Sequence, residues 1–308
     1  MSRGSKLLLV GDNPFHGISH FSQERSRKRD SGIQDFKHAA GLVATALENG
    51  ADGFMFSVSD TTLSILNEVR KAGKAVQFPL YAIVPYAYEY VRLATKVGGI
   101  PGLAKQMAKQ VVRSMNLRAM GMGVKGVVAF DPAALMKTYL YYEISRIRSA
   151  AGKHANIASI MLHEIITEMA LAFDLDWFFK SYIEFMLKIG IKPGFETRNF
   201  SYLVEKFEAW NIDFREVSLV SAFNKMGFQM NPSKIVCEAA LDRASGAEVV
   251  AMSILASGYL KPPEAADYIR TLPGLTGVVV GVSKERHALE TFSFLRNALN
   301  ANVSVSAF

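Results

Sequence analysis

Short apolar runs alternate with longer amphipathic segments along most of the chain. Each run spans only a few residues, is rich in β-branched side chains and is followed by turn-forming or polar residues, which is typical of buried strands in a parallel sheet. The runs are residues 7–10, 53–58, 79–84, 157–162, 192–195, 217–223, 249–255 and 277–282. Parallel strands need a long crossover, usually a helix, between one strand and the next.

The segments between the runs carry apolar residues at helical spacing. They predict helices over residues 36–48, 61–72, 177–189, 202–210, 234–244 and 263–272. A further helix follows the last run through His287, Leu289 and Phe292, with Ser283 as its N-cap. Eight strands that alternate with helices are the count for a closed barrel. The sequence therefore predicts an α/β fold, a (β/α)8 TIM barrel that forms a single domain over residues 1–308.

Residues 86–153 break this alternation. They are rich in Met and basic residues, show mostly helical periodicity and are interrupted by two glycine-containing stretches. We interpret them as a helical insertion after the third strand. Apolar, basic helices of this kind could cover the barrel mouth, form a homo-oligomer contact or touch a membrane surface, and the first two are favoured.

Composition narrows the class of protein. Half of the 308 residues are hydrophobic and a fifth are charged, which is enough for a large core. Cys237 is the single cysteine, which excludes an internal disulfide and favours a reducing, cytoplasmic location. The first residues lead into a strand without the pattern of a signal peptide, and no apolar run reaches the roughly 20 residues of a transmembrane helix.

The net charge of +7 favours a small anionic partner. Basic residues are scattered except at 25–29, so nucleic acid is not expected as a partner. In eight-stranded barrels the loops after the last two strands commonly hold a phosphate, and a helix N-terminus attracts anions. The candidate anion-binding residues in those loops are Ser257, Gly258, Ser283, Lys284 and Arg286.

Polar residues follow most of the other predicted strands, and strand ends converge on one mouth of a barrel. The candidate catalytic residues are His16, His163, Glu164 and Glu196, and further candidates for substrate binding are Asn13, Arg198, Asn224 and Lys225. A histidine there could act as general acid or base, with a glutamate in the second proton-transfer role. Asp12, His16, His163 and Glu196 could instead bind a divalent metal. Lys225 could form a Schiff base if it were desolvated.

Each of these candidates also has a purely structural interpretation. His163 could be a hydrogen-bonded residue inside the barrel, and Glu164 could face the helix layer because neighbouring strand residues point to opposite sides. Asp12 could initiate a turn, since its side chain can bond its own backbone.

Five stretches share a pattern with one known family: 161–163 (MLH), 197–200 (TRNF), 223–224 (FN), 250–258 (VAMSILASG) and 278–283 (VVVGVS). Over residues 155–295 they resemble the strand ends of aldo-keto reductases. The resemblance implies an active-site histidine at His163 and a turn for the phosphate of NADPH after strand eight. That family also carries an aspartate and a tyrosine after strand two, and a lysine at the end of strand three. Here Ser59-Asp60 and Val84-Pro85-Tyr86 stand there, so the proton donor and its lysine are missing.

Three functions remain open at this stage. The favoured one is an enzyme that acts on a small anionic or phosphorylated substrate by acid–base chemistry, with or without a metal, as an isomerase, lyase or hydrolase. The second is an NADPH-dependent oxidoreductase with a different proton donor. The third is a non-catalytic barrel that binds a ligand or partner.

Overall fold

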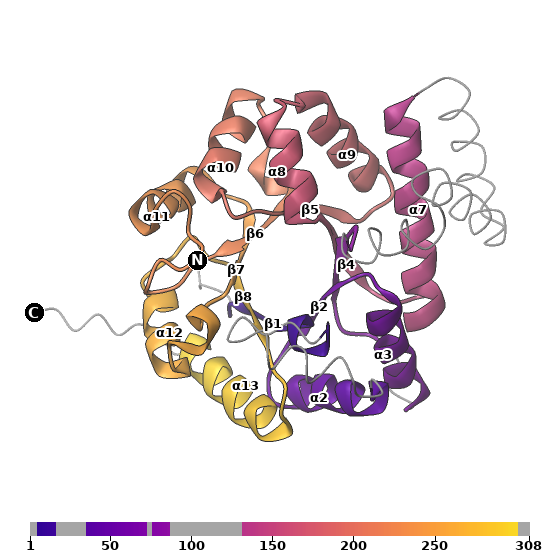
Figure 1. Cartoon of the computed structure of the whole chain (residues 1–308), viewed down its shortest axis with the longest axis vertical. Coiled ribbons are helices and arrows are strands. Elements are labelled where there is room, and N and C mark those ends of the chain that lie inside the picture. Colours follow the sequence, from indigo (N-terminus) through magenta and orange to yellow (C-terminus); the bar gives the residue numbers. More distant parts are fainter. Residues whose placement is uncertain (1–4, 17–34, 73–75, 87–130, 301–308) are drawn as a thin grey trace, which may run out of the picture.

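The computed structural model describes residues 5–16, 35–72, 76–86 and 131–300. Eight parallel strands follow one another around a closed barrel, and β1 pairs with β8 to complete it (Figure 1). The strands are β1 (Leu7–Gly11), β2 (Gly53–Ser57), β3 (Leu80–Val84), β4 (Ile157–Leu162), β5 (Lys192–Glu196), β6 (Ser218–Ala222), β7 (Glu248–Met252) and β8 (Gly277–Gly281). The predicted TIM barrel is therefore confirmed.

Helices surround the barrel as an outer ring (Figure 1). Those of the described residues are α2 (Phe36–Glu48), α3 (Asp60–Lys71), α7 (Pro132–Ala151), α8 (Glu164–Ala172), α9 (Asp176–Lys188), α10 (Phe200–Ala209), α11 (Lys234–Arg243), α12 (Pro262–Arg270) and α13 (Glu285–Asn300). Short 3-10 helices follow β1 (η1, Asn13–His16), α10 (η2, Phe214–Glu216) and β7 (η3, Ala256–Gly258). Among the described residues, no helix is both long and apolar enough to cross a membrane.

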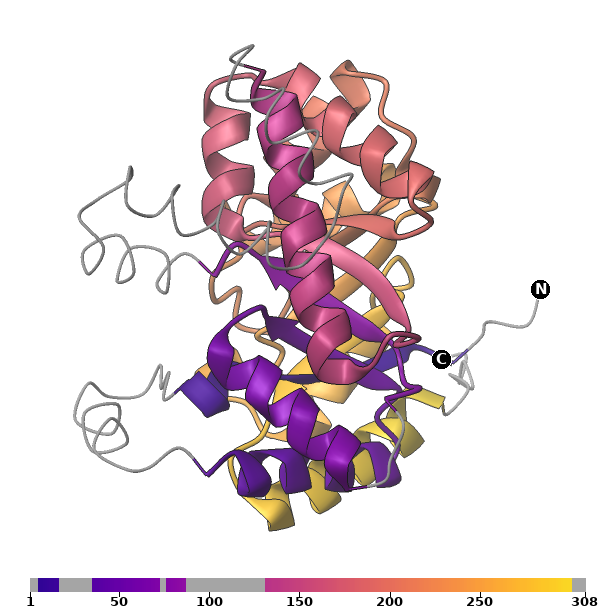
Figure 2. The same ribbon diagram turned by 90° about the vertical axis from the view of Figure 1, so that its right-hand side faces the viewer.

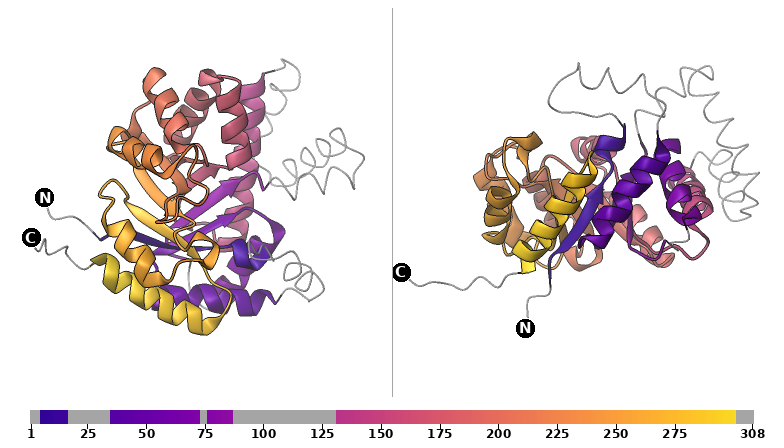
Figure 3. Two further views of the ribbon diagram at one scale, coloured as in Figure 1. Left: turned by 60° about the vertical axis from the view of Figure 1, so that its left-hand side comes forward. Right: turned by 90° about the horizontal axis from the view of Figure 1, so that it is seen from below.

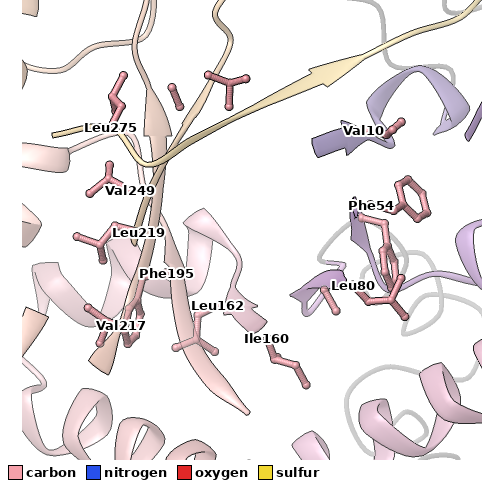
Figure 4. Close-up of a cluster of buried hydrophobic side chains, with 14 of the residues drawn as sticks. Val10, Phe54, Leu80, Ile160, Leu162, Phe195, Val217, Leu219, Val249 and Leu275 are labelled. Carbon is pink, nitrogen blue, oxygen red and sulfur yellow. The ribbon is translucent and has the colours of Figure 1, made fainter. Parts of the chain in front are cut away.

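The strands direct alternate side chains to two separate apolar layers. One layer fills the barrel interior and includes Leu9, Met55, Met161, Val220 and Val250. The other lies between the strands and the helices, where the cluster in Figure 4 is found; its labelled members are Val10, Phe54, Leu80, Ile160, Leu162, Phe195, Val217, Leu219, Val249 and Leu275. This alternation explains why continuous apolar runs, rather than half-polar ones, predicted these strands.

The C-terminal ends of the strands meet at one end of the barrel, which η1 marks. Figure 2 shows the barrel from the side, with η1 at the end where the strands finish. In Figure 3, β1 lies between α2 and α13 and rises to η1. Because Asp12 and His16 follow β1 there, this end is the mouth on which the predicted site residues converge.

Three elements differ from the prediction. α8 follows β4 directly, before α9, and was missed, because Glu164–Ala172 is short and too apolar to show a clear polar face. β7 ends at Met252 and not at residue 255, because Ser253 takes a left-handed backbone (φ 55°) that no strand accommodates. α13 begins at Glu285, so Lys284, and not Ser283, immediately precedes it.

The predicted insertion contains one ring helix. α7 is helical, as expected, and it packs against α3 and α9 as the connection between β3 and β4. Asp131 caps it by accepting hydrogen bonds from the backbone N–H groups of Ala133 and Ala134. Residues 87–130, which make up the rest of the predicted insertion, lie outside the described residues.

Gly53 allows a close strand contact at the start of β2. A Cβ at this position would lie 2.4 Å from the backbone oxygen of Pro79 and 3.1 Å from Leu9 Cδ2. Because a carbonyl on a neighbouring strand cannot move without displacing the sheet, Gly53→Ala is expected to destabilise the fold by about 1–3 kcal/mol, measured by urea unfolding. Gly41→Ala is the control, because nothing lies within 4 Å of a Cβ there. The control should gain about 0.5–1 kcal/mol from helix propensity. Equal stability of Gly53→Ala and wild type would contradict the contact.

Candidate active site

Asp12 and His16 form a pair at the end of β1. Asp12 Oδ2 accepts a hydrogen bond from the backbone N–H of Ser57 at 2.7 Å, which ties the carboxylate to the end of β2. The same oxygen lies 3.0 Å from His16 Nε2, and the two side chains are only 6% and 5% exposed. A carboxylate that holds one imidazole nitrogen fixes the orientation of the ring, an arrangement suited to a general base.

Tyr86 completes this corner and was not selected from the sequence. Its ring stacks on His16 with 4.7 Å between centroids, directly after β3. The available signal was its position after a strand end, which places a side chain at the mouth. Residue 86 is also the first residue of the predicted insertion, and the sequence alone assigns it to that segment and not to the site.

His163 lies at the end of β4 and caps α8. Its Nδ1 accepts a hydrogen bond from the backbone N–H of Ile165 at 3.2 Å, so Nδ1 carries no proton. Burial lowers the pKa of His163, Arg198 lowers it further, and the Glu164 carboxylate acts in the opposite direction. The ring is therefore neutral near pH 7, with its proton on Nε2, and can donate a hydrogen bond.

Glu196, the last residue of β5, has the most perturbed carboxyl group of the mouth. Burial raises its pKa from 4.5 to about 7, and the neighbouring Glu164 carboxylate adds to this effect. Two interactions oppose the shift, a hydrogen bond of 3.2 Å from the backbone N–H of Glu164 and the charge of Arg198. Asp12 also raises the pKa, which places it in the same electrostatic environment. A carboxyl group that titrates near pH 7 can both take up and release protons.

The raised pKa of Glu196 predicts a pH-dependent stability. Between about pH 4.5 and pH 7 the native state holds a proton that the unfolded state has lost. The free energy of unfolding should therefore fall as pH rises through this window, by about 3 kcal/mol for this group. Glu196→Gln cannot titrate, so urea unfolding should show it more stable than wild type at pH 8 and closely similar at pH 4. The same difference at both pH values would contradict the raised pKa.

Glu164 and Arg198 face each other as an ion pair. Arg198 Nε donates to Glu164 Oε2 at 2.5 Å, between the start of α8 and the loop after β5. Glu164 is thus the first residue of a helix and not a strand residue that faces the helix layer. Its carboxylate neutralises part of the Arg198 charge and keeps the guanidinium beside Glu196 and His163.

Glu168 on α8 organises the loop that carries Arg198, and sequence reasoning missed it together with its helix. Its carboxylate accepts hydrogen bonds from Thr197 Oγ1 (2.6 Å), the backbone N–H of Arg198 (2.9 Å) and Asn199 Nδ2 (2.5 Å). A carboxylate with several donors stiffens a loop because each charge-assisted bond is stronger than a neutral one. Glu168 therefore supports the site by holding its neighbours.

The remaining candidates at the mouth are either exposed to solvent or held in hydrogen bonds that close a loop. Asn13 is exposed within η1. Asn224 is fully buried and bonds both the N–H and the carbonyl of Phe228, which closes the loop after β6. Lys225 is exposed, so the desolvation that a Schiff-base lysine needs is absent at this residue.

The predicted anion site is divided between a strained loop and a solvent-exposed helix start. Ser257 and Gly258 have left-handed backbones (φ 57° and 85°), and Ser257 Oγ is buried without a hydrogen-bond partner among the described residues. Ser283 is partly buried and Lys284 is exposed. Arg286 is exposed and pairs along α13 with Glu290 at 2.7 Å. Of these two parts of the predicted anion site, the loop after β7 is the one that presents a buried hydroxyl without a partner among the described residues.

A metal centre has little geometric support in the described part of the chain. There, no three His, Cys, Asp or Glu side chains gather as a set that could hold a metal ion. Of the four predicted ligands, Asp12 and His16 are in direct contact. A site that also includes His163 and Glu196 stays a prediction.

Comparison with known proteins supports the fold. No protein-family profile matches the chain, and no curated protein matches it. Two solved structures from Pseudomonas aeruginosa, both provisionally assigned as aldo-keto reductases, align over 96% of this chain and 92% and 91% of theirs. Their TM-scores are 0.56 and 0.55, at 15% and 14% sequence identity. The barrel is thus similar to aldo-keto reductases in fold, as the resemblance of its strand ends indicated.

Proposed function

We propose that this chain is an enzyme that transfers protons on a small anionic substrate at the C-terminal mouth of the barrel. The observation that supports it is Glu196, whose pKa of about 7 matches the operating pH of a general acid or base. Two further groups lie in the same environment, the Asp12–His16 pair and the neutral His163. Pairs of titratable groups with separated pKa values are typical of acid–base sites.

Each group has a distinct role in this proposal. Glu196 takes a proton from the substrate or returns one to it. His16, oriented by Asp12, serves as the second proton-transfer group. His163 donates a hydrogen bond from Nε2 to a substrate oxygen where negative charge develops, a role that needs a neutral imidazole.

The substrate class follows from the charges beside these groups. Arg198 uses Nε for Glu164, and its side chain is 34% exposed at the mouth. Its terminal nitrogens can hold a carboxylate or phosphate, for which a planar guanidinium is well suited. Isomerisation, elimination and hydrolysis of a small oxyanion are the reactions that this arrangement serves.

Hydrogen–deuterium exchange tests the proposal even when the product is unidentified. Wild-type protein is incubated in D2O with separate samples of small phosphorylated and carboxylated hydroxy and keto compounds. Loss of carbon-bound proton signals is followed by NMR. We expect enzyme-dependent exchange in at least one compound, and Arg198→Met should raise the concentration needed for half-maximal exchange. Exchange in none of them, with no new product in any sample, would overturn the proposal.

An NADPH-dependent oxidoreductase is the second candidate, on two observations. The fold is similar to aldo-keto reductases, and the unpartnered Ser257 Oγ in the loop after β7 suits a cofactor phosphate. NADPH would supply hydride, and Tyr86, whose ring stacks on His16, offers a phenol in place of the missing proton donor. Fluorescence titration with NADPH tests this second candidate. Binding to wild type that weakens in Ser257→Ala would favour the oxidoreductase, and absence of binding would exclude it.

A further inference from the structure

The N-terminal end of the barrel, opposite the candidate active site, has a polar interior. Interior positions near the starts of five consecutive strands carry polar side chains: Tyr81, Ser159, Lys192, Ser218 and Glu248. We call these five residues the barrel floor. TIM-barrel interiors are usually filled by branched apolar residues, so a polar floor needs a reason of its own.

Glu248 is the centre of the barrel floor. Ser218 Oγ donates to Glu248 Oε1 at 2.9 Å, while Lys192 Nζ stands 3.8 Å from the other carboxylate oxygen. Burial raises the pKa of Tyr81, and the Glu248 carboxylate raises it further through its charge and through a hydrogen bond with the phenol. The Lys192 contact is longer than a hydrogen bond, so Glu248 Oε2 retains capacity to accept from another donor.

A cavity opens beside the barrel floor. Its volume is about 340 Å³, and it is lined by Ser5, Leu7, Asp52, Tyr81, Glu248 and Thr276. Leu7 is the first residue of β1, whereas Asp12 follows the last residue of that strand. The cavity therefore lies at the opposite end of the barrel from Asp12, His163 and Glu196.

Ser159 provides a second, independent sign of a ligand. Its side chain is fully buried, and Oγ has no hydrogen-bond partner among the described residues. Register places Ser159 directly between Tyr81 and Lys192, and Oγ lies 2.8 Å from the point where a Cβ on Gly194 would stand. Buried hydroxyl groups without partners are rare because each costs about 1–3 kcal/mol. Ser159 does not itself line the cavity, but its strand neighbour Tyr81 does, so a bound molecule that extends past the Tyr81 ring would satisfy this hydroxyl.

The charges around the cavity select the class of ligand. Asp52 is paired with Arg296, and Glu248 has Lys192 as its nearest cation. Because each carboxylate already has a counter-charge, an added ion would enter the cavity without compensation, and burial of an unpaired charge is costly. A neutral molecule with several hydroxyl groups has no such cost, and each hydroxyl can both donate and accept.

We propose that the cavity binds a neutral polyhydroxy compound, a polyol or monosaccharide. One hydroxyl donates to Glu248 Oε2, another donates to the phenol oxygen of Tyr81, whose own O–H bonds Glu248, and a third pairs with Ser159 Oγ. This site is independent of the proposed proton transfer, since it shares no residue with the C-terminal mouth.

Binding measurements with glycerol, myo-inositol and glucose as separate probes test the proposal. Saturation-transfer NMR gives a dissociation constant for each probe with wild type, Tyr81→Phe, Ser159→Ala and the control Ser181→Ala on α9. We expect millimolar or tighter binding of at least one probe to wild type and control. Tyr81→Phe and Ser159→Ala should each weaken it about tenfold, as expected for loss of one hydrogen bond.

Other outcomes would overturn the proposal. They are absence of binding by all three probes, equal affinity in all four proteins, or preferential binding of putrescine or phosphate at the floor. If a floor variant does not fold, chemical-shift changes of the Tyr81 ring in labelled wild type serve the same purpose, and their absence at saturating probe would overturn the proposal. Probe affinity should be unchanged in Glu196→Gln, which separates this site from the proposed proton-transfer site.

Discussion

Glu196→Gln is expected to lower the rate of substrate proton exchange about 10²–10⁴-fold, the range for loss of a general acid or base. Glutamine retains the shape of the side chain and can still accept the hydrogen bond from the backbone N–H of Glu164, but it cannot exchange a proton at pH 7. Substrate binding through Arg198 should change little. The loss should therefore fall on kcat, measured by steady-state kinetics, and hardly on KM.

Glu184→Gln is the matched control for this result. Glu184 is an exposed carboxyl group on α9, away from the mouth, so the same chemical change there should leave the rate unaffected. Kinetics equal to wild type in Glu196→Gln would remove Glu196 from the chemistry. An equal loss in Glu184→Gln would show that the effect is general and not specific to the site.

Phe179→Ala is expected to cost about 3–5 kcal/mol of unfolding free energy. Phe179 is completely buried, and its ring contacts Phe195, Phe207 and Trp210 with centroids 5.4, 5.4 and 5.3 Å apart. These rings join α9 and α10 to β5, the strand that ends in Glu196. Truncation removes the aromatic contacts and leaves a cavity that the surrounding rings cannot fill.

Phe173→Ala separates this packing effect from loss of a phenyl ring as such. Phe173 is 70% exposed, so its replacement should change stability by no more than about 0.5 kcal/mol in urea unfolding. Similar losses in both variants would contradict the assigned core.

The sequence predicted the barrel because the information lay in local pattern. β2, β3 and β6 are buried at every position, and the other strands are mostly buried and apolar, so each of the eight short runs was visible in isolation from its neighbours. α8 was missed for the opposite reason: a nine-residue helix with mixed apolar positions resembles a loop connection. Ser253 ended β7 early through its backbone conformation, which residue type alone does not reveal.

The residues of the candidate site could be predicted from the sequence by one rule, that the ends of barrel strands converge on one mouth. That rule placed Asp12, His163 and Glu196 at one mouth, where the Asp12 carboxylate acts to raise the pKa of both His163 and Glu196. The interaction partners of the site residues depend on strand register and helix position, which the sequence does not reveal. The pairing of Arg198 with Glu164, the hydrogen bonds of Glu168 and the stacking of Tyr86 on His16 all join segments far apart in sequence or lie in a misassigned element. Arg286, a predicted anion-binding residue, instead pairs with Glu290, because both lie on the exposed face of α13.

Carboxyl 13C NMR of glutamate-labelled protein, titrated from acid to mildly alkaline pH, tests whether Glu196 can take up and release a proton near pH 7. The Glu196 resonance is assigned by its disappearance in Glu196→Gln. We expect this carboxyl group to titrate with a pKa of about 7, well above the ordinary value of 4.5. A midpoint at or below the ordinary value would show that Glu196 is a permanently ionised side chain at neutral pH, and it would contradict the proposed proton transfer.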